Sequence, residues 1–215
     1  MSRGEEICEL TIGAPAHGGA CVARDESGRV VFVRHALPGE RVRARIIDRQ
    51  KRMAWAEALE ILEASPDRIS SVWPAAGPGG VGGGELAHVS PEGQRRWKSE
   101  VLLDQLGRIG RDRVMAQVDA IGGVEVRPAP GDEESDSLLG RRTRIECVVD
   151  AEGFLGMRQY RSHKIVRLDS TPLASAQINA LPVWEGNEVF SSLPQGSRVR
   201  LIAPPGGTPV ICTDQ

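Results

Sequence analysis

Arginine is the residue type whose spacing carries the most chemistry in this chain. The segment RVRARIIDRQKR, residues 41–52, holds six positive charges and one acidic residue. Side chains of a β-strand alternate between two faces, so Arg41, Arg43 and Arg45 share one face. A row of guanidinium groups is typical of a track for an RNA backbone. An ordinary solvated strand face has the same pattern, and both interpretations stay open.

A second cationic stretch lies in the last third of the chain. It consists of Arg141, Arg142, Arg144, Arg158, Arg161, His163, Lys164 and Arg167. If the strands that carry these residues pair, they form a second basic face, with Tyr160 available to stack on bases. A lone histidine among arginines is more typical of a phosphate contact than of a catalytic base. Alternation could also turn Arg144 inward, against Glu146.

Glycine dominates the segment between these two stretches. Six of the eight residues 77–84 are glycine. Such a segment could cradle phosphate, act as a linker, or be the shell of a site whose ligands are gone. The phosphate interpretation fails, because the sequence contains neither GxxxxGK[ST] nor a strand–GxGxxG–helix unit. His88 has no partners at metal-ligand spacing, and no catalytic set of side chains can be assembled. The residues alone indicate a binding protein.

The bulk composition restricts where a nucleic acid could bind. The 215 residues carry a net charge of −2 and a sequence pI of about 6.1, so any such binding depends on local patches. The four cysteines form no CxxC pair, which excludes a zinc ribbon and indicates buried free thiols. The sequence opens with no signal peptide and contains no membrane-spanning run. We expect a cytoplasmic monomer without membrane contact.

The expected elements divide the chain into an all-β domain and an α+β domain. Residues 5–63 read as five short strands, which predicts an OB-like β-barrel over residues 1–65. A glycine-rich loop, residues 66–89, follows. Residues 90–215 are expected to form the α+β domain, beginning with a helix that Ser90 caps and that ends at Gly107 or Gly110.

The remaining elements of that second domain follow from alternation and turn signals. Residues 122–137 are expected to form a strand and then an acidic loop. Residues 141–169 predict an antiparallel meander. A short helix near residues 173–184 and a final hairpin over residues 197–214 complete the domain.

The order of these parts resembles the S-adenosylmethionine-dependent RNA uracil-5-methyltransferases that carry an N-terminal TRAM domain. ELTIGAPAHGGACVARDESGRVVFVRHALPGERVRARI is similar to a TRAM barrel almost from end to end. The spacing of HVSPEGQRRWKSE resembles the family's first helix, and RSHKIVRLDSTPL resembles a signature of its central domain. The resemblance implies that structured RNA, ribosomal or transfer, is the partner, and that the whole protein uses S-adenosylmethionine.

The resemblance also offers an origin for the glycine segment. Many family members hold an iron–sulfur cluster through four cysteines, and thiolates are the ligands that such clusters require. The matching positions in this chain are Ala75, Val81, Gly84 and Thr171. The segment therefore resembles a former cluster loop, and we expect no cluster.

A further departure concerns catalysis. In the family a Rossmann-like catalytic domain follows the central domain, and no cysteine of this chain falls at its nucleophile position. We therefore expect no catalytic residue here. The expected RNA contacts are Arg41, Arg43, Arg45, Arg142, Arg144, Arg161, His163 and Lys164. A stand-alone RNA-binding module and an OB-like protein-interaction module remain alternatives. The apolar final hairpin favours the front half of a longer protein over a natural fragment.

Overall fold

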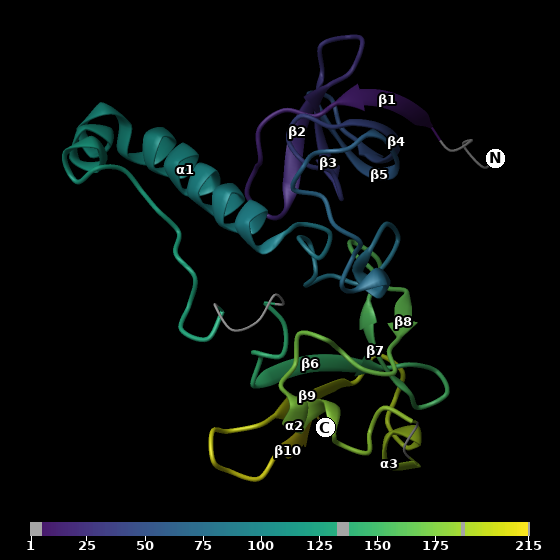
Figure 1. Ribbon diagram of the computed structural model, residues 1–215. Helices are drawn as coiled ribbons and strands as arrows, with labels where there is room; N and C mark the ends of the chain where they lie inside the picture. The colour runs from purple at the N-terminus through teal and green to yellow at the C-terminus, as the bar shows by residue number, and fades with distance from the viewer. Residues whose placement is uncertain (1–5, 133–137, 186–187, 215) are drawn as a thin grey trace. The chain divides into compact units, whose positions relative to one another are not determined.

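The structure is a computed structural model that describes residues 6–132, 138–185 and 188–214. Its contacts divide the chain into two compact units. The first unit contains Met1–Ser71 and Glu85–Asp136, and the second contains Val72–Gly84 and Ser137–Gln215. Each unit has its own five-stranded sheet, drawn in Figure 1.

The first unit is built on the five strands that the sequence predicts. They are β1 (Ile7–Thr11), β2 (Ala20–Arg24), β3 (Val30–Arg34), β4 (Arg41–Arg49) and β5 (Met53–Glu63). Their order in the sheet is β1-β4-β5-β3-β2, and only the β3–β5 pair is parallel. The alternating small and branched apolar residues of these strands form a buried core that includes Val31, Val42 and Ala56.

The two edges of this sheet approach each other just after β1. The Gly13 amide donates to the Val22 carbonyl at 2.8 Å, and the Val22 amide donates to the Ala14 carbonyl at 2.9 Å. A Cβ on Gly13 would lie 2.9 Å from the Val22 oxygen, so this approach requires glycine. Because the edges are bridged in this way, the strand ends do not remain open to pairing with another chain.

Helix α1 (Pro91–Ala120) belongs with the barrel and not with the second sheet. Its Ser90 cap accepts a hydrogen bond from the Gly93 amide at 3.1 Å, as the sequence predicts. Trp97 is 6% exposed and packs into the core of the barrel, which explains why contacts assign the helix to the first unit. The division into compact units therefore differs from a sequence-based boundary at residue 90.

The far end of α1 differs from the prediction. Arg111 has a positive φ of 50°, which interrupts the helix directly after Gly110, one of the two predicted ends. A second helical segment continues to Ala120, and Figure 1 shows the bend between the two. The strand expected from residue 122 is wrong, because the Val126 amide donates to the Ser99 hydroxyl of α1 and not to a strand. Most of the expected acidic loop, residues 133–137, lies outside the described residues.

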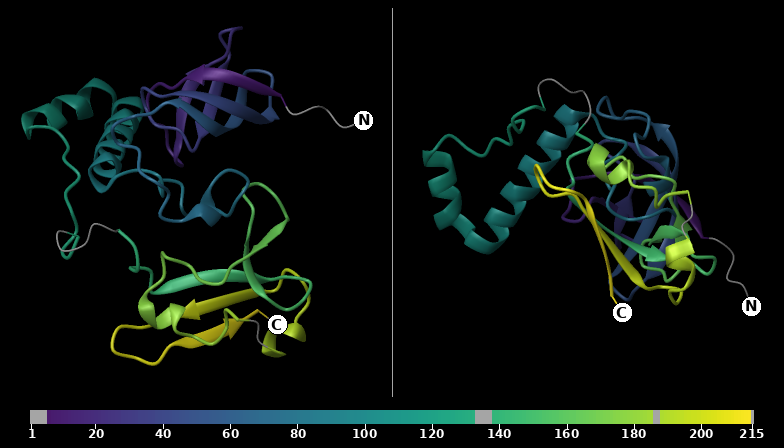
Figure 2. Two further views of the ribbon diagram at one scale, coloured as in Figure 1. Left: turned by 45° about the vertical axis from the view of Figure 1, so that its right-hand side comes forward. Right: turned by 90° about the horizontal axis from the view of Figure 1, so that it is seen from below.

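The second unit is an antiparallel sheet with short helices. Its strands are β6 (Arg144–Val149), β7 (Leu155–Arg158), β8 (Ile165–Arg167), β9 (Arg198–Ile202) and β10 (Val210–Thr213). The order β10-β9-β6-β7-β8 confirms the predicted meander and final hairpin, and Figure 2 shows the sheet in two orientations. Helix α2 (Ala176–Asn179) confirms the predicted short helix. The other short helices are η1 (Pro74–Ala76) and α3 (Glu188–Ser191).

Candidate nucleic-acid interface

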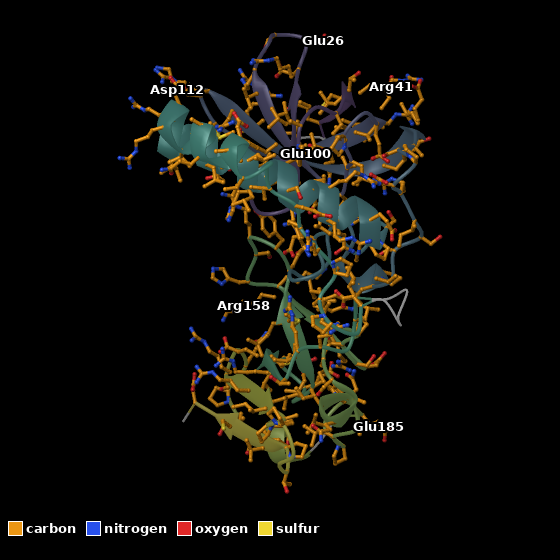
Figure 3. The ribbon with its side chains drawn as sticks, turned by 60° about the vertical axis from the view of Figure 1, so that its left-hand side comes forward. Glu26, Arg41, Glu100, Asp112, Arg158 and Glu185 are labelled. Atoms are coloured by element: carbon orange, nitrogen blue, oxygen red, sulfur yellow. The ribbon has the colours of Figure 1, made fainter. Side chains whose placement is uncertain are left out.

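The three barrel arginines lie side by side on β4, as their alternation predicts. Arg41 and Arg43 are exposed and Arg45 is partly buried, while Val42 and Ala44 between them are fully buried. Arg41 is labelled in Figure 3 on this strand. The position of the row is therefore suitable for contact with a large ligand.

The charge of this row is neutralised by carboxylates on the two neighbouring strands. Arg41 pairs with Glu63 at 2.9 Å and with Glu9 at 3.3 Å. Arg43 pairs with Glu60 and with Glu9, and Arg45 pairs with Glu57 at 3.3 Å. We call these seven residues the arginine–glutamate ladder: Glu9, Arg41, Arg43, Arg45, Glu57, Glu60 and Glu63.

The ladder changes what the barrel face offers to RNA. Four carboxylates stand against three guanidinium groups, so a phosphate that approaches Arg41 or Arg43 also approaches acids. The ladder was not visible in the RVRAR segment itself, because the carboxylates reach it through the pairing of β4 with β1 and β5. The exposed pairs of Arg41 and Arg43 are weak, so these carboxylates screen the two arginines without fixing them in place.

Three of the expected contacts in the second unit lie together in one loop. Arg161, His163 and Lys164 are exposed in the loop between β7 and β8. Arg144 is exposed at the start of β6, so the inward orientation that alternation allowed is not adopted. Glu146, its candidate partner, instead pairs with Arg200 at 2.9 Å.

A hollow of about 450 Å³ lies beside the β7–β8 loop. We call it the hairpin hollow. It is lined by Gly82, Arg158, Gln159, Tyr160, Arg161, Ser162 and His163. Figure 3 labels Arg158, the last residue of β7. None of the residues that line the hairpin hollow is acidic, so its lining favours an anion.

A second hollow, also of about 450 Å³, lies where β6 begins and β9 ends. It is lined by Arg141, Arg142, Thr143, Arg144, Ile202, Ala203 and Pro204. The Arg142 guanidinium also donates to the Gly83 carbonyl at 3.3 Å. The glycine segment is therefore connected to both hollows. Gly82 lines the hairpin hollow, and Gly83 is hydrogen-bonded to Arg142, which lines the second hollow.

The residues at the former cluster positions do not fit an iron–sulfur cluster. None of Ala75, Val81, Gly84 and Thr171 supplies a thiolate. A Cβ on Gly84 would lie 2.6 Å from the Ala76 Cβ and 2.8 Å from Trp73 Cε3, so protein atoms occupy the space of a ligand side chain. Val81 is 1% exposed, and the loop is held by backbone bonds such as Val81 N–H to Ala75 O at 2.8 Å.

The cysteines of the described residues give no activated nucleophile. Cys21 and Cys147 are buried, and burial raises the pKa of the Cys147 thiol to about 12. Burial likewise raises the pKa of the Cys21 thiol far above its ordinary value. Both thiols are protonated at neutral pH and suit a packing role. The prediction of buried thiols is confirmed for these two, whereas Cys8 is partly buried and Cys212 is exposed.

Sequence reasoning missed a buried polar cluster in the barrel. Glu40 is fully buried, and its carboxylate accepts hydrogen bonds from Arg68 and from the Leu37 and Ser65 amides. His35 and His88 are each 6% exposed, with ring centroids 6.0 Å apart. No local pattern predicts this burial, because the guanidinium that pairs with Glu40 lies 28 positions further along the chain. The cluster is closed to RNA and serves the fold.

A known domain family matches the part of the sequence that forms the barrel. The family model of the TRAM domain matches residues 3–59. The chain therefore carries a TRAM domain in its first unit, followed by a unit with a cationic antiparallel sheet. Among the described residues, no helix is both long and apolar enough to cross a membrane.

The relatives of the chain carry the name RNA methyltransferase. An uncharacterized RNA methyltransferase of Streptomyces avermitilis is 40% identical over 207 residues, which cover 93% of this chain and 47% of that protein. The 23S rRNA (uracil(1939)-C(5))-methyltransferase RlmD of Halomonas elongata is 35% identical over 209 residues, which cover 94% of this chain and 40% of that protein. The chain thus spans less than half the length of these relatives.

A solved structure has a related fold. It is the tRNA (uracil-54, C5)-methyltransferase of Pyrococcus abyssi in complex with S-adenosyl-L-homocysteine. The TM-score is 0.55 at 18% identity, and the match covers 96% of this chain and 46% of that one. The likeness supports the order of the two units within a longer fold.

Proposed function

We propose that this chain is the RNA-recognition part of an RNA uracil-5-methyltransferase. The second unit binds the phosphates of a structured RNA, and methyl transfer takes place on residues outside this chain. S-adenosylmethionine supplies the methyl group in the whole protein. The chain by itself binds RNA and methylates nothing.

The observation that carries the proposal is the contrast between the two cationic surfaces. Both hollows of the second unit are lined by arginines and no carboxylate, whereas the barrel row is paired within the arginine–glutamate ladder. Phosphate contacts supply much of the affinity of RNA-binding proteins. The second unit is therefore the principal RNA contact in this proposal, and the barrel is a minor one.

The comparisons support the reaction class. The relatives at 35–40% identity are named RNA methyltransferases, and two of the proteins that the chain resembles are named uracil C5-methyltransferases. Each of these proteins is more than twice the length of the matched region, which leaves room for a catalytic part.

The ladder favours a second candidate function for the barrel alone. A mixed-charge face with paired arginines is closer in character to the rim of a protein interface than to a phosphate track. In this alternative the barrel contacts a protein, and RNA binding by the chain is absent.

Fluorescence anisotropy with a labelled RNA stem-loop, measured at several salt concentrations, distinguishes the RNA-binding proposal from the protein-interaction alternative. The triple variant Arg142→Ala, Arg144→Ala, Lys164→Ala should weaken binding and lower the slope of log affinity against log salt by roughly two to three units. The matched control replaces two ladder pairs together: Arg41→Gln with Glu63→Gln, and Arg43→Gln with Glu60→Gln. It keeps the net charge and should bind as the wild type does.

Two results would contradict the proposal. If the wild-type chain shows no affinity for RNA at low salt, the protein-interaction alternative is favoured. If the control loses as much affinity as the triple variant, the barrel contributes as much as the second unit, and the second unit is not the principal contact.

A further inference from the structure

We propose that the hairpin hollow is a subsite for one unstacked nucleotide of a single-stranded RNA segment. The base stacks on Tyr160, and the adjoining phosphate contacts Arg158, Arg161 or His163. This inference rests on the proposed function and deepens it, because it assigns a particular hollow to a particular part of the RNA.

The size and lining of the hollow suit such a ligand. Its volume of about 450 Å³ is within the ~300–1,000 Å³ typical of small-molecule sites. Arg158, Arg161 and His163 are exposed, while Tyr160 is partly buried and so has a fixed surrounding. Cationic groups next to one aromatic ring are the combination that single-stranded nucleic acids require.

The aromatic ring already has a cationic group within cation–π range. The Arg161 guanidinium lies over the Tyr160 ring, 5.9 Å from its centroid. Unstacked RNA bases are bound both by aromatic rings and by guanidinium planes. Tyr160 is the only tyrosine in the chain.

The backbone of the loop is held in a conformation that suits glycine better than arginine. Arg161 has a φ of 53°, and the Ser162 amide closes a turn onto the Gln159 carbonyl at 3.1 Å. Non-glycine residues in such conformations cluster at binding sites, where their side chains compensate for the strain. An arginine in this conformation is therefore a candidate for a binding role of its side chain.

The glycine segment also lines the hairpin hollow, and it is hydrogen-bonded to the β7–β8 loop. The Tyr160 amide donates to the Gly80 carbonyl at 3.2 Å, and Val81 forms an isolated bridge with Gln159. Gly82 lines the hollow and contributes no side chain to it. The former cluster loop is thereby given a present role: it shapes one side of a nucleotide subsite.

The test uses the whole chain labelled with ¹⁵N and a five-nucleotide single-stranded oligouridylate. Amide shifts of Gly82 and of residues 160–163 should change saturably as RNA is added. Inorganic phosphate at the same concentration should change them far less. If phosphate alone reproduces the changes with equal affinity, the hollow binds an anion only and the nucleotide proposal is overturned.

Substitutions at two positions distinguish the contribution of the Tyr160 ring to RNA binding from that of the Arg161 charge. Tyr160→Leu should weaken binding of the pentanucleotide about tenfold, and Tyr160→Phe should restore it, because the ring and not the hydroxyl stacks. Arg161→Gly should lower the salt slope by about one unit while the melting temperature stays equal or rises, because glycine relaxes the positive φ. Arg127→Ala, at an exposed arginine paired with Glu125 in the first unit, is the matched control and should change neither.

The outcomes distinguish this inference from the proposed function. If the wild type binds neither the stem-loop nor the pentanucleotide, the proposed function fails. If both RNAs bind but Tyr160→Leu equals the wild type, the function stands and the subsite assignment is wrong.

Discussion

Two buried histidines of the barrel make the free energy of unfolding depend on pH. His35 and His88 are buried, and both imidazoles are held neutral: burial, with nearby cations, lowers the pKa of His35 to about 3 and that of His88 to about 4. Arg34 and Arg68 contribute to the lowering, and Glu85 opposes it at His35. The unfolded chain, by contrast, binds protons at both residues below about pH 6.5.

The first unit should therefore lose stability as the pH falls from 6.5 to 5. Since the folded pKa values lie below the unfolded ones, the unfolded state binds more protons and stability is greatest above pH 6.5. Each histidine adds a slope of up to about 1.4 kcal/mol per pH unit. Urea unfolding between pH 5 and 7.5 measures it, with His17→Ala, an exposed histidine, as the control. Equal slopes in the wild type and in His88→Phe would contradict the expectation.

The buried Glu40 carboxylate pairs with the guanidinium of Arg68. Arg68→Leu should destabilise the first unit by about 3–5 kcal/mol, because it leaves a fully buried carboxylate without its guanidinium. Arg96→Leu breaks the more exposed pair with Asp67 and should cost less than about 1 kcal/mol. Denaturant unfolding compares the two, and similar losses would mean that the burial of Glu40 is misjudged.

At the scale of elements, side chains pack closely in the loop between Val72 and Gly84. Trp73, Ala76 and Val81 are buried where the resemblance places a cluster, and the Thr171 hydroxyl is buried without a hydrogen-bond partner among the described residues. Leu173, two residues further on, lies 3.7 Å from a Cβ built on Gly83, so this segment borders the loop.

Gly84→Ala should destabilise the second unit by about 1–3 kcal/mol, because the new methyl group has no room between Ala76 and Trp73. The same change at Gly107, inside α1 and in ordinary contact with Met115, should stabilise by about 0.5–1 kcal/mol. Thermal unfolding of both variants checks the opposite signs. A neutral Gly84→Ala would show that the loop is loosely packed.

The chain should also purify without iron under anaerobic conditions and should take up no cluster when supplied with iron and sulfide. The reason is the chemistry of the four positions, which offer no thiolate. Iron and sulfide analysis with a visible absorbance spectrum makes the measurement. Stoichiometric iron bound to the chain would show that the site lies elsewhere.

At the scale of the molecule, two units with different surfaces share one chain. The net charge of −2 describes neither unit by itself. The β4 arginines of the barrel lie among glutamates, whereas arginines line both hollows of the second unit. Electrostatic attraction of RNA follows such local fields and not the total charge. The segment Val72–Gly84, which contains the glycine segment, belongs to the second unit although the residues on either side of it belong to the first.

The chain by itself should not bind S-adenosylmethionine. Its sequence has no glycine fingerprint that follows a strand and opens a helix, and α1 is preceded by a capped loop that packs on the barrel. Isothermal titration calorimetry against the cofactor should show no saturable heat, while the RNA titration described above does. Stoichiometric binding would reveal a cofactor site within these residues.

The sequence by itself determined the elements whose signals are local. Alternation located all five barrel strands and the outward row of Arg41, Arg43 and Arg45, and Ser90 with Pro91 marked the start of α1. Turn residues located the meander and the last hairpin. One local signal was misleading: Gly110 predicted the end of the helix α1, but a second helical segment follows Arg111.

Only the tertiary structure decided which charges meet. The ladder arises because strand pairing brings Glu9 and Glu60 beside Arg43, at separations of 34 and 17 residues that no local pattern reports. Likewise, Gly82 and Tyr160 line one hollow although 78 positions separate them. Electrostatic and packing interactions depend on distance in space. One basic segment of the sequence is therefore surrounded by carboxylates in the first unit, and the other lines hollows without acidic residues in the second.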